Sequence, residues 1–301
     1  MTTREATQLI MRRLTPLYGA DEAQAMMRDI MLAVVNYSPV DIVLREQSEL
    51  PEFAPQRLRE ILDRLERHEP LQYVLGTARF HGMDFKVTPS TLIPRPETEM
   101  LVDMIVDDCG DRTDLRVLDI GTGSGCIAIA LARALRFPTV DAIDISEQAL
   151  AVARDNASRL KATVNFRQAD VLAPVNGQRS TVNLSTYDII VSNPPYVMQS
   201  EAATMDANVL DYEPRSALFV PDDDPLLFYR AIATLAMTAL TPQDGHNELC
   251  PYNGGRLYLE INPLLANETL TLLKDSGLTD CRLHRDQYGR LRFATASLPS
   301  I

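Results

Sequence analysis

The residue types and spacing best suited to chemistry occur in Ser192-Asn-Pro-Pro-Tyr196, which follows a short apolar segment. Two consecutive prolines hold the backbone extended and remove two N–H donors, so the flanking carbonyl oxygens remain as acceptors. The asparagine adds a side-chain carbonyl acceptor and an amide donor, and the tyrosine ring can lie flat against a planar group. Taken alone, an Asn-Pro turn without catalytic meaning is the alternative. We interpret the motif as a clamp for an amide or amino group, formed by Asn193, Pro194, Pro195 and Tyr196.

A second candidate site is the glycine-rich run Val117-Leu-Asp-Ile-Gly-Thr-Gly-Ser-Gly125. Glycines at alternate positions let the backbone turn tightly and approach a ligand closely. Their spacing differs from the G-x-G-x-x-G fingerprint, which argues against a dinucleotide oxidoreductase. Asp119 can orient the loop or meet a cationic ligand. A tight turn without a ligand is the alternative to a binding loop formed by Gly121, Thr122, Gly123, Ser124 and Gly125.

Two further acidic residues stand at or just after the ends of predicted strands. Asp144 comes about 20 residues after the glycines, where a carboxylate can accept hydrogen bonds from both hydroxyls of a ribose. An N-cap-like role before a helix that starts near Ser146 is the alternative. Asp170 can lie near an adenine amine or remain a solvated loop carboxylate.

Strands and helices alternate around these residues, with helices predicted at 126–135 and 147–160. This alternation is typical of a mostly parallel sheet with helices on both faces, in which ligands bind beyond the carboxyl ends of the strands. The sequence therefore predicts an α/β fold. Residues 241–255 are polar and rich in turn formers, which predicts an exposed insertion. The predicted strands cover 116–120, 140–144, 164–168, 187–192, 256–261, 280–284 and 291–296.

The preceding part of the chain is predicted to be helical up to about residue 75. Leu58, Ile61 and Leu65 follow the spacing of an amphipathic helix, and Asp21 is a candidate N-cap of an earlier helix. Alternation around Gly82 predicts a hairpin over 77–88, and a helix is predicted to begin at Pro96. The predicted domains are a helical domain over 1–75, a β-hairpin linker over 76–95 and a larger α/β domain over 96–301.

Composition limits the classes of function. The 301 residues carry a formal net charge of −12, which disfavours a polyanion held on a broad basic surface. No apolar run is long enough to span a membrane and no signal peptide is evident, so we expect a cytoplasmic protein. Four scattered cysteines and four histidines predict no metal site. Buried free thiols in a reducing compartment are the simplest interpretation of the cysteines.

The order of the glycine loop, Asp144 and the Asn-Pro-Pro-Tyr motif resembles class I S-adenosylmethionine-dependent methyltransferases that act on amide or amino nitrogen. Three other stretches narrow the resemblance to the peptide chain release factor N(5)-glutamine methyltransferase family, and it covers roughly residues 5 to 298. These stretches are Pro70-Leu-Gln-Tyr-Val-Leu-Gly76, Ile93-Pro-Arg-Pro-Glu-Thr-Glu99 and Tyr212-Glu-Pro-Arg-Ser-Ala-Leu218.

The resemblance implies a seven-stranded methyltransferase sheet preceded by a small helical domain that recognises the substrate. It implies S-adenosylmethionine as cofactor and, as substrate, the glutamine of a Gly-Gly-Gln loop in release factors. In this chain, Gly121 to Gly125 then line the methionine end of the cofactor and Asp144 holds the ribose. Asp170 or Val171 holds the adenine, and Asn193 to Tyr196 hold the substrate amide, with Asn193 also beside the cofactor.

Several alternatives stay open at this level. The same clamp can hold the exocyclic amine of adenine in a DNA or RNA methyltransferase, although such an enzyme flips its base and binds phosphates. A ribosomal-protein glutamine methyltransferase and a non-catalytic module that retains the fold are the others. Arg95, Glu97 and Glu99 can contact substrate or brace the linker. No residue is assigned as a general base.

Overall fold

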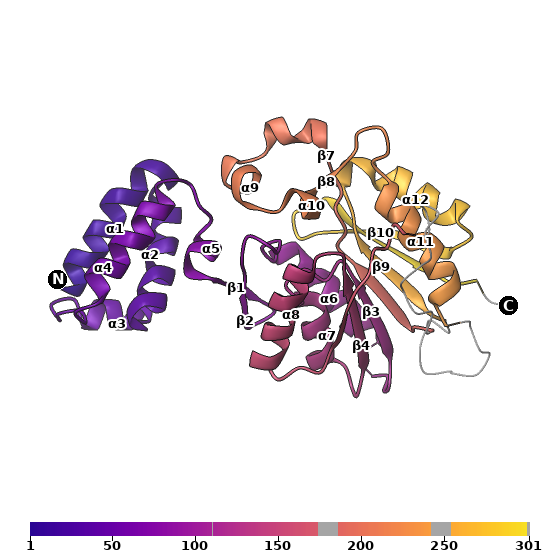
Figure 1. Cartoon of the computed structure of the whole chain (residues 1–301), viewed down its shortest axis with the longest axis horizontal. Coiled ribbons are helices and arrows are strands. Elements are labelled where there is room, and N and C mark those ends of the chain that lie inside the picture. Colours follow the sequence, from indigo (N-terminus) through magenta and orange to yellow (C-terminus); the bar gives the residue numbers. More distant parts are fainter. Residues whose placement is uncertain (110, 174–185, 242–253, 300–301) are drawn as a thin grey trace. The chain divides into compact units, whose positions relative to one another are not determined.

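The computed structural model describes residues 1–109, 111–173, 186–241 and 254–299. The chain divides into two compact units (Figure 1). The first comprises Met1–Thr77 with Asp206–Tyr212, and the second comprises Ala78–Met205 with Glu213–Ile301. Most of the predicted insertion at 241–255 lies outside the described residues.

The first unit is helical and has its own apolar core. In α4, Pro55 occupies the first turn, where no N–H partner is needed, and Leu58 and Ile61 are buried. The N-cap prediction for Asp21 is wrong, because α2 begins at Ala20 and Asp21 lies inside its first turn. There its carboxylate interacts favourably with the positive end of the helix dipole. The helices are α1 (Thr3–Tyr18), α2 (Ala20–Val35), α3 (Pro39–Leu44), α4 (Ala54–Leu65), α5 (Leu71–Leu75) and α9 (Ala207–Tyr212).

The second unit contains a seven-stranded sheet in the order β10-β11-β9-β6-β3-β4-β5. The pairs β6–β9, β3–β6, β3–β4 and β4–β5 are parallel, whereas β11 is antiparallel to both neighbours. The predicted mostly parallel α/β fold is therefore confirmed. The strands are β3 (Arg116–Ile120), β4 (Thr139–Asp144), β5 (Asn165–Gln168), β6 (Ile189–Ser192), β9 (Arg256–Glu260), β10 (Thr279–Arg285) and β11 (Leu291–Ser297).

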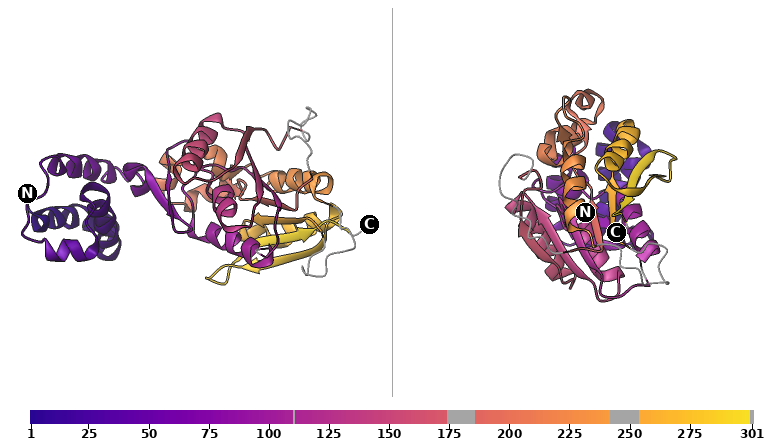
Figure 2. Two further views of the ribbon diagram at one scale, coloured as in Figure 1. Left: turned by 90° about the horizontal axis from the view of Figure 1, so that it is seen from below. Right: turned by 90° about the vertical axis from the view of Figure 1, so that its right-hand side faces the viewer.

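Helices cover both faces of this sheet (Figure 2). Successive strand side chains point to opposite faces, so Val117 packs in the cluster with α6 and α7, while Leu118 and Ile120 pack in the cluster with α11 and α12. The near-continuous burial of β3, β4 and β6 follows from this double cover. The larger helices are α6 (Pro96–Cys109), α7 (Cys126–Ala134), α8 (Glu147–Arg159), α11 (Leu227–Ala239) and α12 (Ala266–Asp275).

Shorter elements complete the second unit. The predicted hairpin is present as β1 and β2, and Gly82 has φ +74 in its turn, a conformation that glycine adopts without steric cost. The predicted helix that starts at Pro96 is α6. The short elements are β1 (Thr77–Phe80), β2 (Met83–Lys86), β7 (Val197–Met198), η1 (Gln199–Thr204), α10 (Arg215–Leu218), β8 (Phe219–Val220) and η2 (Pro263–Leu265).

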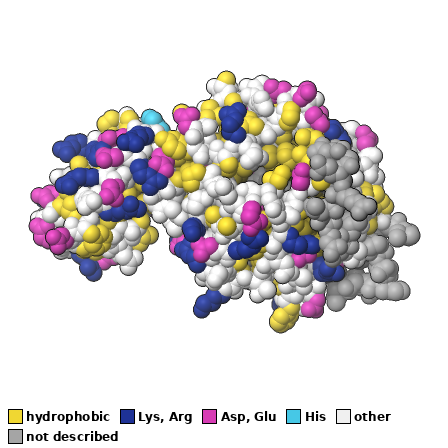
Figure 3. Space-filling model, in the orientation of Figure 1, with side chains coloured by type: hydrophobic (Ala, Val, Ile, Leu, Met, Phe, Trp, Pro, Cys, Tyr) yellow, Lys and Arg dark blue, Asp and Glu magenta, His cyan; other side chains and the backbone are white. Residues whose placement is uncertain are grey.

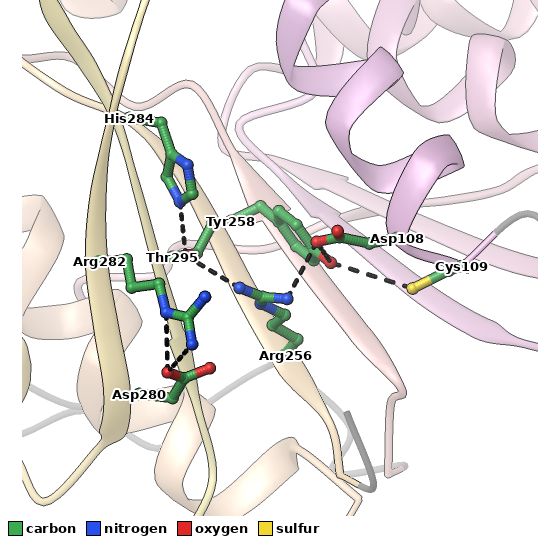
Figure 4. A network of polar contacts seen from close by, with 8 residues as sticks. All are labelled: Asp108, Cys109, Arg256, Tyr258, Asp280, Arg282, His284 and Thr295. Atoms are coloured by element: carbon green, nitrogen blue, oxygen red, sulfur yellow. Dashed lines mark hydrogen bonds and ion pairs between the residues drawn. The ribbon is translucent and has the colours of Figure 1, made fainter. Parts of the chain in front are cut away.

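A polar network lies at the amino end of β9 (Figure 4). The buried Arg256 pairs with Asp108 of α6 at 3.0 Å and donates to Thr295 of β11 at 3.2 Å. The Tyr258 hydroxyl donates to the same Asp108 oxygen at 2.9 Å, and His284 of β10 lies 2.9 Å from the Thr295 hydroxyl. These contacts join the end of α6 to β9, β10 and β11. They lie at the end of the sheet opposite to the carboxyl ends of its parallel strands.

Among the described cysteines, Cys109 and Cys126 are buried free thiols and Cys281 is a half-buried one. Cys250 lies outside the described residues. In the described part of the chain, no helix is long and apolar enough to cross a membrane, and no group of side chains could hold a metal ion.

Candidate active site

A cavity of about 400 Å³ opens at the carboxyl ends of the parallel strands. β3 is the central one of the five parallel strands, with β4 and β5 on one side and β6 and β9 on the other, so the strand order reverses beside it. Ligands of open α/β sheets bind at such a switch point, and the volume falls within the range of small-molecule sites. The sequence-predicted residues that line the cavity are Gly121, Gly123, Asp144, Asp170, Val171, Asn193, Pro194 and Pro195.

The glycine loop follows β3 and is tied to the end of β4. The backbone N–H groups of Gly121 and Thr122 both donate to the carbonyl of Ile143. Gly123 has φ +55, a backbone conformation that favours glycine. Gly125 has φ +82, and a Cβ atom at this position would lie 3.1 Å from the side chain of Ala153. Only Gly121 and Gly123 of the loop line the cavity. Thr122 and Ser124 are buried, and Gly125 caps α7.

Asp119 is fully buried beneath this loop. Its Oδ2 accepts from the Thr122 hydroxyl at 2.6 Å and from the Ala128 N–H at 3.2 Å. Its Oδ1 is buried without a hydrogen-bond partner among the described residues. Burial is the main cause that raises the pKa of Asp119 to about 7. One oxygen therefore orients the loop, which is one of the two roles that the sequence suggested for Asp119.

Asp144 ends β4 and lines the cavity. Its Oδ2 accepts from the Gly123 N–H at 2.9 Å and its Oδ1 accepts from the Ser146 N–H at 2.8 Å. Ser146, not Asp144, is the N-cap of α8. Burial raises the pKa of Asp144, and the backbone N–H donors act in the opposite direction. Because each carboxylate oxygen has more than one acceptor site, Asp144 keeps capacity for ligand hydroxyls.

Asp170 and Val171 line the cavity after β5, beside Ala169. One oxygen of Asp170 accepts from the Leu172 N–H at 2.8 Å, which holds the turn in place. The carboxylate and the neighbouring apolar side chain therefore face the same ligand space from the third parallel strand.

The Asn-Pro-Pro-Tyr motif begins at the end of β6. The Ser192 hydroxyl donates to the Ile120 carbonyl at 2.7 Å, which fixes the motif against β3. Asn193, Pro194 and Pro195 line the cavity, whereas Tyr196 is not among the lining residues. The Tyr196 hydroxyl donates to Glu260 at 3.0 Å, and burial raises its pKa strongly. The structure thus brings the first three residues of the predicted clamp to the cavity and directs the tyrosine hydroxyl elsewhere.

Two buried polar residues that were given no role from the sequence stand behind Asn193. The Nδ2 of Asn193 donates to the Thr98 hydroxyl at 3.1 Å, and this hydroxyl donates to Glu260 at 2.7 Å. Glu260 is the last residue of β9 and is buried, and burial raises its pKa. Its place at the carboxyl end of a parallel strand was the one signal in the sequence that could have drawn attention to it.

Two of the three charged residues of the segment 93–99 make polar contacts within the second unit. Arg95 pairs with the buried carboxylate of Glu213, which also accepts from the Ile93 N–H at 3.1 Å. Glu99 accepts from the His81 N–H at 2.9 Å in the hairpin turn. These contacts favour the bracing alternative for Arg95 and Glu99. No hydrogen bond or ion pair of Glu97 is found within the described ranges.

Comparison with known proteins gives concordant results over nearly the whole chain. A family model described as the methyltransferase small domain matches residues 96–211, and one described as the PrmC N-terminal domain matches residues 5–76. The chain is 43% identical to a release factor glutamine methyltransferase from Bacteroides thetaiotaomicron, over 97% of this chain and 98% of that protein. It is 39% identical to a protein of the same name from Flavobacterium psychrophilum, with 95% of both chains covered.

Among solved structures, a 16S rRNA N2 G1207 methyltransferase from T. thermophilus, in complex with AdoMet and guanosine, matches with a TM-score of 0.51. The two chains are 16% identical, and the match covers 74% of this chain and 50% of the other, so it bears on the fold alone. The near-full-length identity to curated relatives decides the family. The chain belongs to the release factor glutamine methyltransferases.

Proposed function

We propose that this protein transfers a methyl group from S-adenosylmethionine to the side-chain amide nitrogen of the glutamine in the Gly-Gly-Gln loop of peptide chain release factors. The observation that carries the proposal is that Asn193, Pro194 and Pro195 share one cavity with the glycine loop and Asp144. An acceptor-rich corner for an –NH2 group therefore lies beside a site with the features of a nucleoside pocket. Release factors act in translation, so we infer a cytoplasmic location.

The residues present fit S-adenosylmethionine. Gly121 and Gly123 line the cavity. Directly beneath this loop, Oδ1 of Asp119 is buried without a hydrogen-bond partner among the described residues, and it would accept a hydrogen bond from the ammonium group of the cofactor. Asp144, Asp170 and Val171 line the same cavity. In this proposal Asp144 would accept hydrogen bonds from the ribose hydroxyls, and Asp170 and Val171 would flank the adenine. When bound, the cofactor supplies a methyl group made electrophilic by a positively charged sulfur.

The role of the chain is to prepare a poor nucleophile. The lone pair of an amide nitrogen is delocalised into its carbonyl group. The Oδ1 of Asn193 and a neighbouring main-chain carbonyl accept the two amide hydrogens, which raises the electron density on nitrogen and fixes its direction. With the cofactor bound, this nitrogen would take the methyl group, the electron pair of the broken S–C bond would stay on sulfur, and the nitrogen would then lose a proton to solvent. Positioning and a preorganised electrostatic environment supply most of the acceleration.

Charge supports a protein substrate over a nucleic acid. On the face drawn in Figure 3, basic and acidic side chains are interspersed over the second unit, and the formal net charge of the chain is −12. An adenine-N6 methyltransferase that binds phosphates needs a basic surface. The names of the curated relatives likewise favour release factors over a ribosomal protein.

A labelling experiment tests this proposal. The purified chain is incubated with methyl-labelled cofactor and either a release factor, the same factor with its Gly-Gly-Gln glutamine replaced by glutamate, a ribosomal fraction or duplex DNA. We expect label on the intact release factor alone, mapped by mass spectrometry to that glutamine. Label on DNA or on a ribosomal protein, with none on the release factor, would support the corresponding alternative.

A further inference from the structure

The orientation of the Asn193 amide decides whether the clamp can work. An asparagine side chain fills the same space whether its oxygen or its amino group faces a ligand. Only the oxygen can accept a hydrogen from a substrate –NH2 group. The amino group would meet that –NH2 group donor to donor, so a reversed side chain would weaken the clamp without changing its shape.

The hydrogen bonds behind Asn193 have a definite direction. Oε1 of Glu260 accepts from the Tyr196 hydroxyl at 3.0 Å, and Oε2 accepts from the Thr98 hydroxyl at 2.7 Å. A hydroxyl has one hydrogen, so a Thr98 oxygen that donates to Glu260 can only accept from its other neighbour. That neighbour is Nδ2 of Asn193, at 3.1 Å.

The chain of contacts is well shielded from solvent. Thr98 is 2% exposed and Glu260 is 1% exposed, so water does not compete for these bonds. Polar groups buried in this way are costly to leave unpaired, and a fully paired network holds its members in one arrangement. Within the part of the chain that the structure describes, the bond to Thr98 is the one hydrogen bond of the Asn193 side chain.

We infer that Thr98 and Glu260 are positioning residues. They hold the side-chain amino group of Asn193 toward Thr98, so that the side-chain oxygen of Asn193 is the group available to accept a hydrogen bond from the substrate amide. Thr98 lies in α6 and Glu260 at the end of β9, 95 and 67 residues from Asn193 in the chain, so neither belongs to the motif that they orient. This inference rests on the proposed function, because it assigns a task within the same reaction.

The test compares Thr98→Val with Thr98→Ser. Valine keeps the shape of threonine but has no hydroxyl, whereas serine keeps the hydroxyl. At saturating cofactor and release factor, we expect Thr98→Val to lower kcat by about tenfold to a hundredfold, less than the roughly 10²–10³ lost with a directly acting polar group. The Kd for S-adenosylmethionine should stay within about twofold, and Thr98→Ser should recover most of kcat.

Thr269→Val is the matched control. Thr269 is a buried threonine of α12 whose hydroxyl donates to the Leu265 carbonyl at 2.8 Å. Its loss should lower Tm to a comparable degree and leave kcat unchanged. The inference is overturned if Thr98→Val keeps kcat within about twofold of the wild type, if Thr98→Ser falls as far as Thr98→Val, or if Thr269→Val lowers kcat equally. Failure of the wild-type chain to methylate the release factor would instead count against the proposed function.

Discussion

Arg95 and Glu213, 118 residues apart in the chain, form an ion pair in which the carboxylate is only 1% exposed. The pair joins residues 93–99 to residues 212–218, two stretches that carry the family resemblance in the sequence. The same carboxylate holds the backbone of Ile93. Leu92 and Pro214, which flank this contact in the sequence, both line the cavity. One buried glutamate therefore fixes two walls of the ligand site.

Removing that carboxylate should loosen both walls. In Glu213→Ala the Ile93 N–H loses its partner, and Arg95, which is 34% exposed, keeps some access to water. We expect the free energy of unfolding to fall by about 2 kcal/mol, the scale of a lost charged hydrogen bond. The Kd for S-adenosylmethionine should rise several-fold. Urea unfolding and calorimetric titration measure the two effects.

A surface ion pair supplies the control for this variant. Asp155 pairs with Lys86 at 3.0 Å, and both side chains are more than 40% exposed. Asp155→Ala should change stability by less than about 1 kcal/mol and leave cofactor affinity unaltered. Equal losses in the two variants would show that the Glu213 contact has no special role.

Asp144 should govern cofactor affinity more than turnover. A carboxylate that holds ribose hydroxyls contributes charged hydrogen bonds of about 1.5–3 kcal/mol, so Asp144→Ala should weaken binding roughly tenfold to a hundredfold. The ribose is common to S-adenosylmethionine and its demethylated product, so both should weaken by the same factor in calorimetry. Unchanged affinity for both compounds would refute the ribose role. Asp144 would then serve only to hold the backbone through the Gly123 and Ser146 N–H groups.

The buried Asp119 predicts a pH dependence of stability. Its pKa of about 7 in the folded chain exceeds the value of about 3.9 in an unfolded chain. Between these values the folded state binds more protons than the unfolded state, so this group lowers the free energy of unfolding as pH rises toward 7. Asp119→Asn does not titrate. Its stability relative to the wild type should therefore increase from pH 5 to pH 8 in urea unfolding, and parallel profiles of the two proteins would refute this.

The network at the amino end of β9 should matter for stability and not for catalysis (Figure 4). Asp108→Ala removes one partner of Arg256, which is 3% exposed, and one partner of the Tyr258 hydroxyl. Breaking a fully buried pair costs roughly 3–5 kcal/mol. We expect about 2 kcal/mol here because Asp108 is 29% exposed. kcat should be unchanged. Arg282→Ala is the control, because it removes the exposed ion pair with Asp280. It should lower the free energy of unfolding by less than about 1 kcal/mol. A clear loss of kcat in Asp108→Ala would contradict the assignment of this network to stability.

Local patterns predicted the elements that carry the site, because apolar strands and the glycines between them are encoded by neighbouring residues. The strand at 116–120 was predicted with the bounds that β3 has, and, as expected, Gly121 follows β3 and Asp144 ends β4. Helix ends were less certain, as the capping of α2 by Gly19 instead of Asp21 shows. That choice depends on the backbone conformation at Gly19, which has φ +80.

Contacts between distant segments could not be predicted from these patterns. The Thr98–Asn193 bond spans 95 residues and depends on how α6 packs beside the end of β6. The Tyr196 hydroxyl bonds to Glu260, 64 residues away, which a reading of the motif by itself could not show. Polar side chains such as these have several possible partners, and only the packed fold selects one.

The central claim is that the oxygen of Asn193 holds and activates an amide nitrogen. Its most direct test is the single-turnover rate of Asn193→Ala on a release factor, measured together with the Kd for S-adenosylmethionine. The predicted result is a rate at least about 10²-fold below that of the wild type, with the Kd changed by less than about threefold. A rate close to that of the wild type would contradict the claim.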